Sequence, residues 1–486
     1  MTAGNPKSKA LWDFIALSGG EVIGKLAGLV AFAYLARVLG PEVYGSVEVA
    51  GALLVFFMLI IDFGYGPVGA REITQHPEKL AQYAGMIPAA RVLLALLCVP
   101  AMCLTAILMK LPSGTAGLVC LYSLAMLAAP WNQRWLFQGL DRMVLVSLGQ
   151  LIRMLMFTVG VILLVQAPAD LMRVGYVEIV AAAAMATYFV SMQLRSSIPV
   201  RLDFELRPIL EISQQSISLG LSQAVWALNQ YLPTLLIASL SLVTEVSWFG
   251  AAHRIVFSVV SFSMIYHFNL FPAVTQRLKK SHESFSRLVE PSFRVTAWGS
   301  FFIAIVITFL AGPICEVVYG ADYAAAALPM AIIIWSLPLT LFSGHSRWPL
   351  VAVHKQRYVL YAQLAGLFAT AVSGAFLIPR YGSLGGAVAM LLNAACVWFT
   401  AHYFASRFVG NIPFIGAILR QLLLAALVMV AVFGIAGLNW YSALAGISGF
   451  AILAFVVDRK LPGDIRSLVQ VKNENVAADA DAGAGV

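Results

Sequence analysis

The sequence predicts an all-α integral membrane protein of about 14 transmembrane helices, with two lobes of six helices and two further helices at the C-terminal end. Of its 486 residues, 60% are apolar and 11% are charged, whereas a soluble domain carries about 25% charged residues. Residues 92–109 and 422–440 contain no charge, and an apolar stretch of roughly 18 residues is typical of a transmembrane helix. These two observations, with the loop charges below, predict the fold class.

Fourteen apolar stretches are long enough to cross a membrane as helices. The first one contains Glu21 and Lys25 and follows a polar N-terminus, so we expect a retained span rather than a cleavable signal. The first twelve stretches form the lobes, and a count of 12 or 14 depends on the last two. The ranges are 14–37, 46–69, 86–109, 115–138, 144–165, 174–194, 214–240, 247–274, 295–319, 325–343, 358–378, 384–405, 414–437 and 440–457.

Basic residues concentrate in alternate loops of this scheme. The intervening loops hold only Lys110, Arg173 and Arg380. Because Lys and Arg collect in cytoplasmic loops, this alternation supports the count and predicts that both termini are cytoplasmic.

The predicted domains follow the helices: 1–194 as the N-lobe, 195–213 as a cytoplasmic linker, 214–405 as the C-lobe, 406–457 as the last two helices, and 458–486 as a disordered cytoplasmic tail. A weak internal repeat supports two parallel halves. ARVLGPEVYG at 36–45 and ASLSLVTEVSWFG at 238–250 each end the first helix of a six-helix set with Glu-Val, an aromatic residue and Gly. Parallel repeats are common in transporters, with the binding site between the halves, although a chance similarity would look the same.

The stretch DFGYGPVG at 62–69 combines G-x-G-x-x-G with DFG. A dinucleotide fingerprint requires a short strand before it and an acidic residue about 20 residues later, but the preceding apolar run is too long and the acid is missing. We therefore interpret these glycines as a loosened helix end, with Pro67 able to kink the chain.

Catalytic and metal sites are not indicated. The loops contain no Ser/His/Asp set, paired carboxylates or metal-ligand spacing, and the five cysteines lie in apolar spans. The net charge of +8 is spread over loops, which does not suggest a nucleic-acid surface. We expect neither an enzyme nor a metalloprotein.

Among the acidic residues within apolar spans, where a lone charge costs roughly 2.5–3.5 kcal/mol, three are informative: Glu21, Asp62 and Glu178. Glu21 and Lys25 are spaced i,i+4 on one helix and can neutralise each other, or Lys25 can face a hydrated lumen and bind an anion. Asp62 and Glu178 can brace their helices or titrate during transport. We therefore treat Asp62, Glu21 and Glu178 as candidate ion-coupling residues.

Basic and polar groups form the candidate substrate site. Arg254 follows His253 and has no acid four residues away, so its partner must come from another helix, lipid or substrate. Arg91 and Arg153 can bind substrate or extend to the lipid headgroups. Asn229 precedes Pro233 and Asn269 precedes Pro272, which suggests broken helices or polar contacts between helices.

Several motifs, in this order, resemble the polysaccharide-exporter family. They are LARVLGPEVYG at 35–45, DFG at 62–64, RE at 71–72, RWLFQGLDRM at 134–143 and FLIPRYGSLGGAVA at 376–389. The family is that of the Wzx-type lipid-linked oligosaccharide (O-antigen or exopolysaccharide) flippases, in the MOP superfamily with the MATE exporters and lipid II flippases.

The resemblance implies a MATE-like two-lobed carrier in a bacterial inner membrane. It would move an undecaprenyl-pyrophosphate-linked glycan to the outer leaflet by alternating access through a cationic lumen, with H+ or Na+ as a possible coupling ion and other glycan-assembly membrane proteins as partners. Lys25 and Arg254 match the lumen cations of related flippases. Many relatives have an Asp near the position of Leu232, which weakens a coupling role for 214–240 here.

Two other functions stay open at this point. A MATE-like drug or cation exporter would favour an acidic lumen, against Lys25 and Arg254. A membrane enzyme of glycan assembly would be expected to carry a large outer loop with polar catalytic groups, which this scheme lacks.

Overall fold

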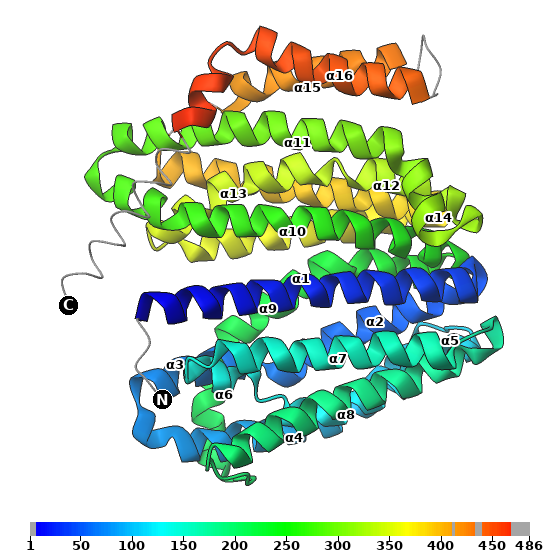
Figure 1. Ribbon diagram of the computed structural model, residues 1–486, viewed down its shortest axis with the longest axis vertical. Helices are drawn as coiled ribbons and strands as arrows, with labels where there is room; N and C mark the ends of the chain where they lie inside the picture. The colour runs from blue at the N-terminus through cyan, green and yellow to red at the C-terminus, as the bar shows by residue number, and fades with distance from the viewer. Residues whose placement is uncertain (1–5, 411–413, 433–439, 468–486) are drawn as a thin grey trace. The chain divides into compact units, whose positions relative to one another are not determined.

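The computed structural model describes the backbone of residues 6–410, 414–432 and 440–467, and the side chains of 23–410, 418–432 and 443–467. These residues form α-helices joined by turns and short 3₁₀ segments, without strands (Figure 1). The α-helices are α1 (Pro6–Leu39), α2 (Pro41–Asp62), α3 (Tyr65–Gln75), α4 (Leu80–Leu108), α5 (Ser113–Ala125), α6 (Arg134–Gly139), α7 (Met143–Leu164), α8 (Leu171–Arg195), α9 (Leu206–Leu240), α10 (Val243–Lys280), α11 (His282–Tyr319), α12 (Ala327–Ile333), α13 (Ser336–Ala352), α14 (Gln356–Phe408), α15 (Phe414–Val430) and α16 (Trp440–Val457).

The predicted fold class is confirmed, because the predicted stretches coincide with helix over the residues that the structure describes. Three stretches are interrupted, giving the successive pairs α2 and α3, α5 and α6, and α12 and α13. Conversely, α14 covers two predicted helices, which meet at Gly382 with φ 52° and ψ −123°. Only the ends differ substantially: α11 begins well before residue 295, because its first turns are too polar for a hydropathy pattern to detect.

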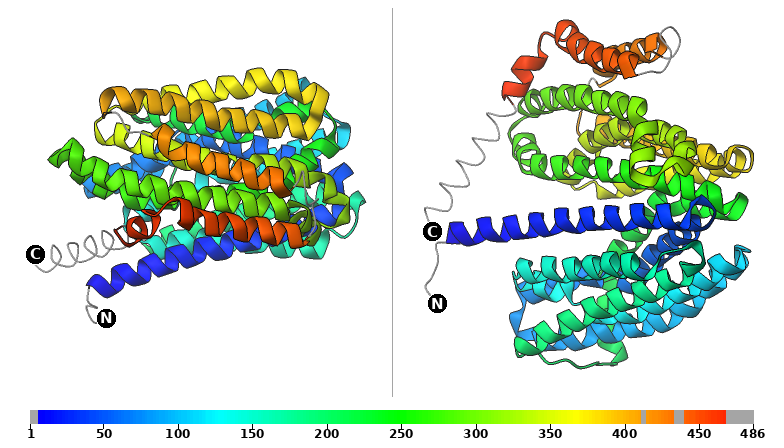
Figure 2. Two further views of the ribbon diagram at one scale, coloured as in Figure 1. Left: turned by 90° about the horizontal axis from the view of Figure 1, so that it is seen from above. Right: turned by 45° about the vertical axis from the view of Figure 1, so that its right-hand side comes forward.

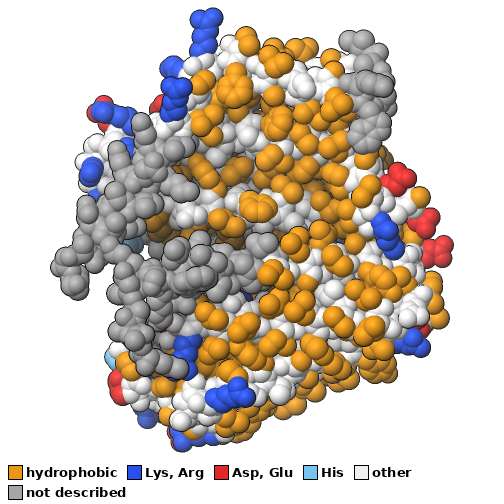
Figure 3. Space-filling view, in the orientation of Figure 1, with side chains coloured by type: hydrophobic (Ala, Val, Ile, Leu, Met, Phe, Trp, Pro, Cys, Tyr) orange, Lys and Arg blue, Asp and Glu red, His pale blue; other side chains and the backbone are white. Residues whose placement is uncertain are grey.

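Nine segments among the described residues are long and apolar enough to cross a membrane. They run from Pro41–Gln75 to Gln356–Phe408. The described parts of α15 and α16 form shorter apolar helices. The chain is therefore a multi-pass membrane protein. Figure 3 shows one face, where hydrophobic side chains spread along the helices and most charged side chains lie towards the helix ends.

The chain divides into two compact units by its internal contacts. Unit 1 comprises Met1–Gly250 with Val318–Asp322, and unit 2 comprises Ala251–Val317 with Tyr323–Val486. Internal contacts group α9 and the first turns of α10 with the N-terminal helices. The predicted lobe boundary at 195–213 stays a prediction.

In unit 1, α1 packs along α7, and α7 along α8 (Figures 1 and 2). The Tyr34 hydroxyl donates to Val165 O at 2.9 Å, and the Thr158 hydroxyl lies 3.1 Å from Ala27 O. The Tyr34 side chain of α1 thus bonds to the turn after α7, and the Thr158 side chain of α7 bonds to the backbone of α1, which fixes the position of α1 within unit 1.

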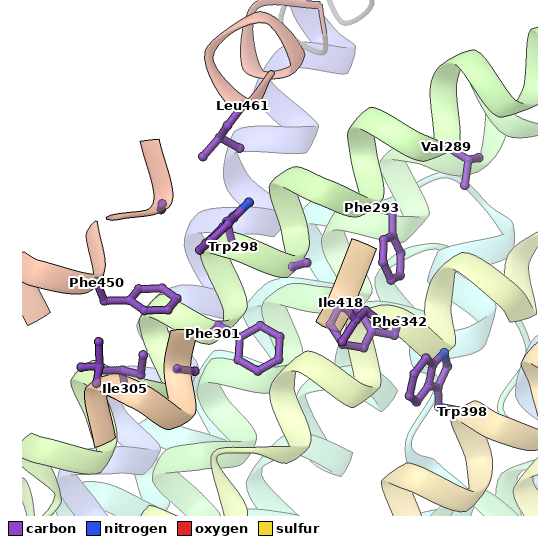
Figure 4. Close-up of a cluster of buried hydrophobic side chains, with 14 of the residues drawn as sticks. Val289, Phe293, Trp298, Phe301, Ile305, Phe342, Trp398, Ile418, Phe450 and Leu461 are labelled. Carbon is purple, nitrogen blue, oxygen red and sulfur yellow. The ribbon is translucent and has the colours of Figure 1, made fainter. Parts of the chain in front are cut away.

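In unit 2, an aromatic core joins α11 to the last helices. Trp298 lies with its ring centre 5.6 Å from that of Phe450 on α16, and Leu461 packs into the same cluster (Figure 4). The indole Nε1 of Trp298 donates to Asp458 Oδ2 at 3.0 Å, and Arg294 Nε donates to Asp464 Oδ2 at 2.7 Å.

These contacts correct one prediction about the tail. The disordered segment was expected to begin at residue 458, but 461–467 is helical and held against α11. Sequence composition missed this because the anchoring residues are few and their partners lie more than 150 residues away. The rest of the predicted tail lies outside the described residues.

The two similar stretches, 36–45 and 238–250, contact each other within unit 1. A Cβ added to Gly45 on α2 would lie 2.2 Å from Val243 O on α10. A Cβ on Gly250 would lie 2.5 Å from Cγ of Glu48, again between α10 and α2. Each stretch thus contributes a glycine that lets the helix carrying the other stretch approach closely.

Candidate functional site: charged residues within the helices

The DFG stretch forms a helix break. Phe63 has φ 47° and Gly64 has φ 79°, both left-handed, and helix resumes at Tyr65. Pro67 is not the kink, because it lies in the first turn of α3, where a backbone N–H has no partner within the helix. A Cβ on Gly220 of α9 would lie 2.7 Å from Phe63 O, so α9 crosses the break at a glycine.

Asp62 ends α2 at this break and forms an ion pair with Arg91 of α4. The Asp62 carboxylate accepts from Nη2, while Nη1 of Arg91 donates to Asn132 O at 3.0 Å. The Arg91 side chain is 5% exposed and that of Asp62 is 27% exposed. Asp62 therefore neutralises a buried guanidinium and holds α4 against the break.

A second ion pair joins α7 to α8. Nη2 of Arg153 donates to the Glu178 carboxylate. The Glu178 side chain is 5% exposed and that of Arg153 is 23% exposed. Both pairs lie within unit 1, and each couples neighbouring helices by opposite charges that would be costly if separated.

These pairs correct the expectation that Arg91 and Arg153 extend to lipid headgroups. A snorkelling side chain keeps its charged end in water, whereas the Arg91 guanidinium points inward to an acid and a carbonyl. The sequence did not reveal the partners, because each acid lies on a different helix, 29 or 25 positions away.

Lys25 is exposed on α1, beside Gly24. The side chain of Glu21 lies outside the described residues, so the predicted Glu21–Lys25 pair stays a prediction. A Cβ added to Gly28, one turn further on, would lie 3.4 Å from Cε of Met154 on α7, which is ordinary van der Waals contact. Gly28 of α1 thus contacts α7.

Arg254 and His253 lie on α10 in unit 2. Arg254 is partly buried, and His253 is 8% exposed, with its ring centre 5.7 Å from that of Phe257. Lys25 and Arg254 belong to different units, and a shared cationic lumen stays a prediction.

Asn229 is buried on α9, and its Nδ2 donates to Val225 O at 2.8 Å. The expected breaks at Pro233 and Pro272 are wrong, because α9 and α10 continue through both prolines. A transmembrane helix tolerates proline where neighbouring groups satisfy the freed backbone.

Sequence reasoning missed a polar cluster in unit 2. His267 of α10 and His345 of α13 are 3% and 2% exposed, and their rings are in hydrogen-bond contact at 3.3 Å. Ser292 of α11 joins them, and Arg347 of α13 has a buried Nε without a partner in the described structure. The contributing positions are far apart in the sequence, and His345 and Arg347 lie between the predicted spans 325–343 and 358–378.

No group of three or more His, Cys, Asp or Glu residues that could hold a metal occurs among the described residues. The five cysteines are free and fully or partly buried.

Comparison with known proteins gives one family and several relatives. The family described as "Polysaccharide biosynthesis protein" matches residues 10–278, more than half of the chain. A Shigella dysenteriae protein described as an O-antigen transporter is 20% identical over 377 residues, covering 76% of this chain and 93% of that protein.

Two solved structures share the fold. The lipid II flippase MurJ, in an inward closed conformation, aligns with a TM-score of 0.71 and 14% identity over 92% of this chain and 99% of its own. An inward-facing multidrug resistance MATE family transporter of the MOP superfamily aligns with a TM-score of 0.62 and 12% identity over 82% of this chain and 98% of its own.

These relatives are transporters and flippases rather than enzymes, and the prediction that the chain is not an enzyme is confirmed by them. The resemblance to polysaccharide exporters is confirmed as well. With its family match, its O-antigen transporter relative and its MurJ-like and MATE-like fold, this chain belongs to the polysaccharide biosynthesis protein family.

Proposed function

We propose that the protein is a flippase that moves a polyprenyl-pyrophosphate-linked oligosaccharide from the cytoplasmic to the outer leaflet of a bacterial inner membrane. The observation that carries the proposal is the combination of family and fold. The matched family concerns polysaccharide biosynthesis, and the relative covering 76% of the chain is described as an O-antigen transporter. The fold is that of a lipid II flippase.

The cargo explains why a protein is needed. Its apolar tail can remain in lipid, but its phosphates and sugars cannot cross hydrocarbon without losing their hydrogen bonds to water. A hydrated path with fixed positive charge would replace those interactions. Two rocking groups of helices would open this path alternately to each side.

The charge arrangement suggests which cations serve the cargo. Arg91 and Arg153 are already neutralised by Asp62 and Glu178, so we assign them to helix packing. Lys25 is exposed on α1, and Arg254 is partly buried on α10. We propose that these two bind the anionic linkage. The coupling ion, H+ or Na+, would be a further ligand, and Glu21 stays a candidate for binding it.

The proposal predicts loss of export when Lys25 or Arg254 loses its charge. In cells that depend on this protein, Lys25→Ala and Arg254→Ala should lower surface glycan at least about tenfold, because each removes a charge-assisted contact to phosphate. Surface glycan is measured by labelling intact cells, with protein abundance in the membrane measured in parallel.

Two controls separate charge from folding. Lys25→Arg should retain most export, because it preserves the positive charge. Lys79→Ala removes an exposed loop cation and should leave export unchanged. Wild-type glycan levels in both Lys25→Ala and Arg254→Ala would rule out these two residues as the phosphate ligands.

A further inference from the structure

The buried histidines of unit 2 form a continuous hydrogen-bonded chain across three helices. His267 Nε2 lies 3.3 Å from His345 Nδ1, and His345 Nε2 lies 2.8 Å from Ser292 Oγ. Ser292 Oγ lies 2.7 Å from the Tyr266 hydroxyl. The chain begins and ends on α10 and passes through α13 and α11, so the positions of its protons affect how these three helices hold together.

The neighbours determine which ring nitrogen carries each proton. His345 Nδ1 lies 2.9 Å from Leu341 O, and His267 Nδ1 lies 2.7 Å from Ser263 O. A carbonyl oxygen only accepts, so both Nδ1 atoms must be protonated in the neutral pair. His345 Nε2 then accepts from Ser292, which in turn accepts from Tyr266. His267 Nε2 is left as an acceptor facing the Nδ1–H of His345.

One added proton would reverse this chain. Protonating His267 at Nε2 would place its N–H against the N–H of His345. The conflict is relieved when His345 moves its proton from Nδ1 to Nε2. His345 then accepts from His267 and donates to Ser292, and Ser292 donates to Tyr266. The pair gains one proton, and Leu341 O loses its side-chain donor.

The surroundings disfavour positive charge on the pair, so that it takes up at most a single proton, and only in acid. The charged side chain close enough to act on His267 is Arg347, which is cationic, and no carboxylate of the described residues acts on either ring. Two imidazolium rings in contact would repel strongly at low dielectric. The titratable neighbours that face the pair are therefore Tyr266 and Arg347, with Ser292 as the linking hydroxyl.

The packing holds the rings together and leaves a small pocket beside them. A Cβ on Gly344 would lie 2.2 Å from Cε1 of His267, so α13 can bring His345 to His267 only because this position is glycine. A pocket lined by both histidines, Gly344 and Trp348 has a volume of about 10 Å³, about the least that admits one water molecule.

We propose that His267 and His345 form a proton-binding site whose occupation reverses the hydrogen-bond chain linking α10, α11 and α13. Resting on the proposed function, this site would take the coupling ion, a proton, and convert its binding into a change in the contacts among these helices. Asp62 and Glu178 would then act as structural partners of arginines rather than as the coupling groups.

The site is tested first without any cargo. The full-length protein is labelled with ¹⁵N-histidine in nanodiscs, and its ring nitrogens are followed by NMR from pH 8 to pH 4, through and well below the ordinary histidine pKa of about 6.5. The chain has seven histidines, and single variants assign the two signals. We expect one proton to enter the pair, with His345 changing from the Nδ1–H to the Nε2–H form as His267 becomes an imidazolium. Two rings that stay neutral to pH 4, or that titrate independently without a tautomer change, would overturn the proposal.

The structure suggests well-matched variants. Asn229 and Asn269 each donate from Nδ2 to the carbonyl four residues earlier, at 2.8 Å. His267→Asn and His345→Asn should preserve the same backbone contacts while removing the ring that takes up a proton. Gly344→Ala retains both histidines but separates them and should abolish the coupled tautomer change. His354→Asn, on an exposed histidine, is the control.

The role of the histidine pair in coupling is then tested by measuring glycan export. In wild-type cells and in the His354→Asn control, a protonophore should lower surface-glycan export about tenfold. The His267→Asn and His345→Asn variants should export at the same low rate with and without the protonophore. A wild-type response in those variants would overturn the coupling role. A wild-type protein that exports no lipid-linked glycan would refute the proposed function, whereas the NMR result would stand by itself.

Discussion

At the scale of single residues, two arginines within the helices are neutralised by acidic residues on neighbouring helices. Arg91 and Arg153 each meet an acid on a neighbouring helix, and both side chains of the Arg153–Glu178 pair are less than a quarter exposed. The sequence identified all four residues as significant, because charges inside apolar stretches are rare. It did not pair them, since nothing within one helix records which side chains face each other across a contact.

This account predicts an asymmetry between breaking and replacing the Asp62–Arg91 pair. Arg91→Met should destabilise the protein by about 3 kcal/mol, because it leaves the Asp62 carboxylate without its cation. The double variant Asp62→Leu with Arg91→Met should recover much of that loss, because no buried charge remains. Thermal unfolding of the purified protein in detergent measures both. Equal destabilisation in the single and double variants would show that Arg91 stabilises the protein by contacts other than its ion pair with Asp62.

At the scale of elements, helix position was predictable and helix interruption was not. Apolar length located every stretch, and the glycines at 64 and 382 lie where the chain leaves helical geometry. The prolines were misleading: α9 and α10 continue through Pro233 and Pro272, whereas α2 ends at Asp62 before a left-handed Phe63. Whether a proline interrupts a helix depends on tertiary neighbours, which the local sequence does not contain.

The crossing of α9 over the DFG break gives an element-scale prediction. Gly220→Ala should destabilise the protein by about 1–3 kcal/mol, because its Cβ would lie 2.7 Å from Phe63 O and a backbone atom cannot easily move aside. Gly299→Ala on α11 is the matched control. A Cβ there meets nothing within 4 Å, and alanine should be neutral or stabilising by up to about 1 kcal/mol. Similar unfolding temperatures for the two variants would contradict the close crossing.

A second element-scale prediction concerns the segment after α16. The Arg294 guanidinium donates two hydrogen bonds to Asp464, at 2.7 and 3.2 Å. Asp464→Asn should destabilise this segment by about 1–3 kcal/mol, because it removes a charge-assisted bidentate contact. Hydrogen exchange of residues 458–467 should rise accordingly. Unchanged exchange would mean that the Trp298 and Leu461 contacts alone hold the segment.

At the scale of the whole molecule, composition, loop charge and motif order together predicted a multi-pass transporter of the polysaccharide-exporter type. The family and the fold confirm that level of description. The proposed proton site could not be predicted in the same way. The histidine pair joins positions 78 residues apart, and each imidazole alone resembles an ordinary polar residue in a transmembrane helix. Such sites depend on contacts among helices, and hydropathy and charge patterns do not encode those contacts.

The central claim, transport of a lipid-linked glycan between leaflets, is tested most directly by the location of that glycan when the protein is absent. The gene is deleted, and lipid-linked oligosaccharide is measured in total membranes and, with an impermeant sugar-modifying reagent, on the outer leaflet alone. The account predicts accumulation in the total membrane with almost none accessible from outside, reversed by the wild-type gene and not by Lys25→Ala. Oligosaccharide that reaches the outer leaflet normally in the deletion strain would contradict it.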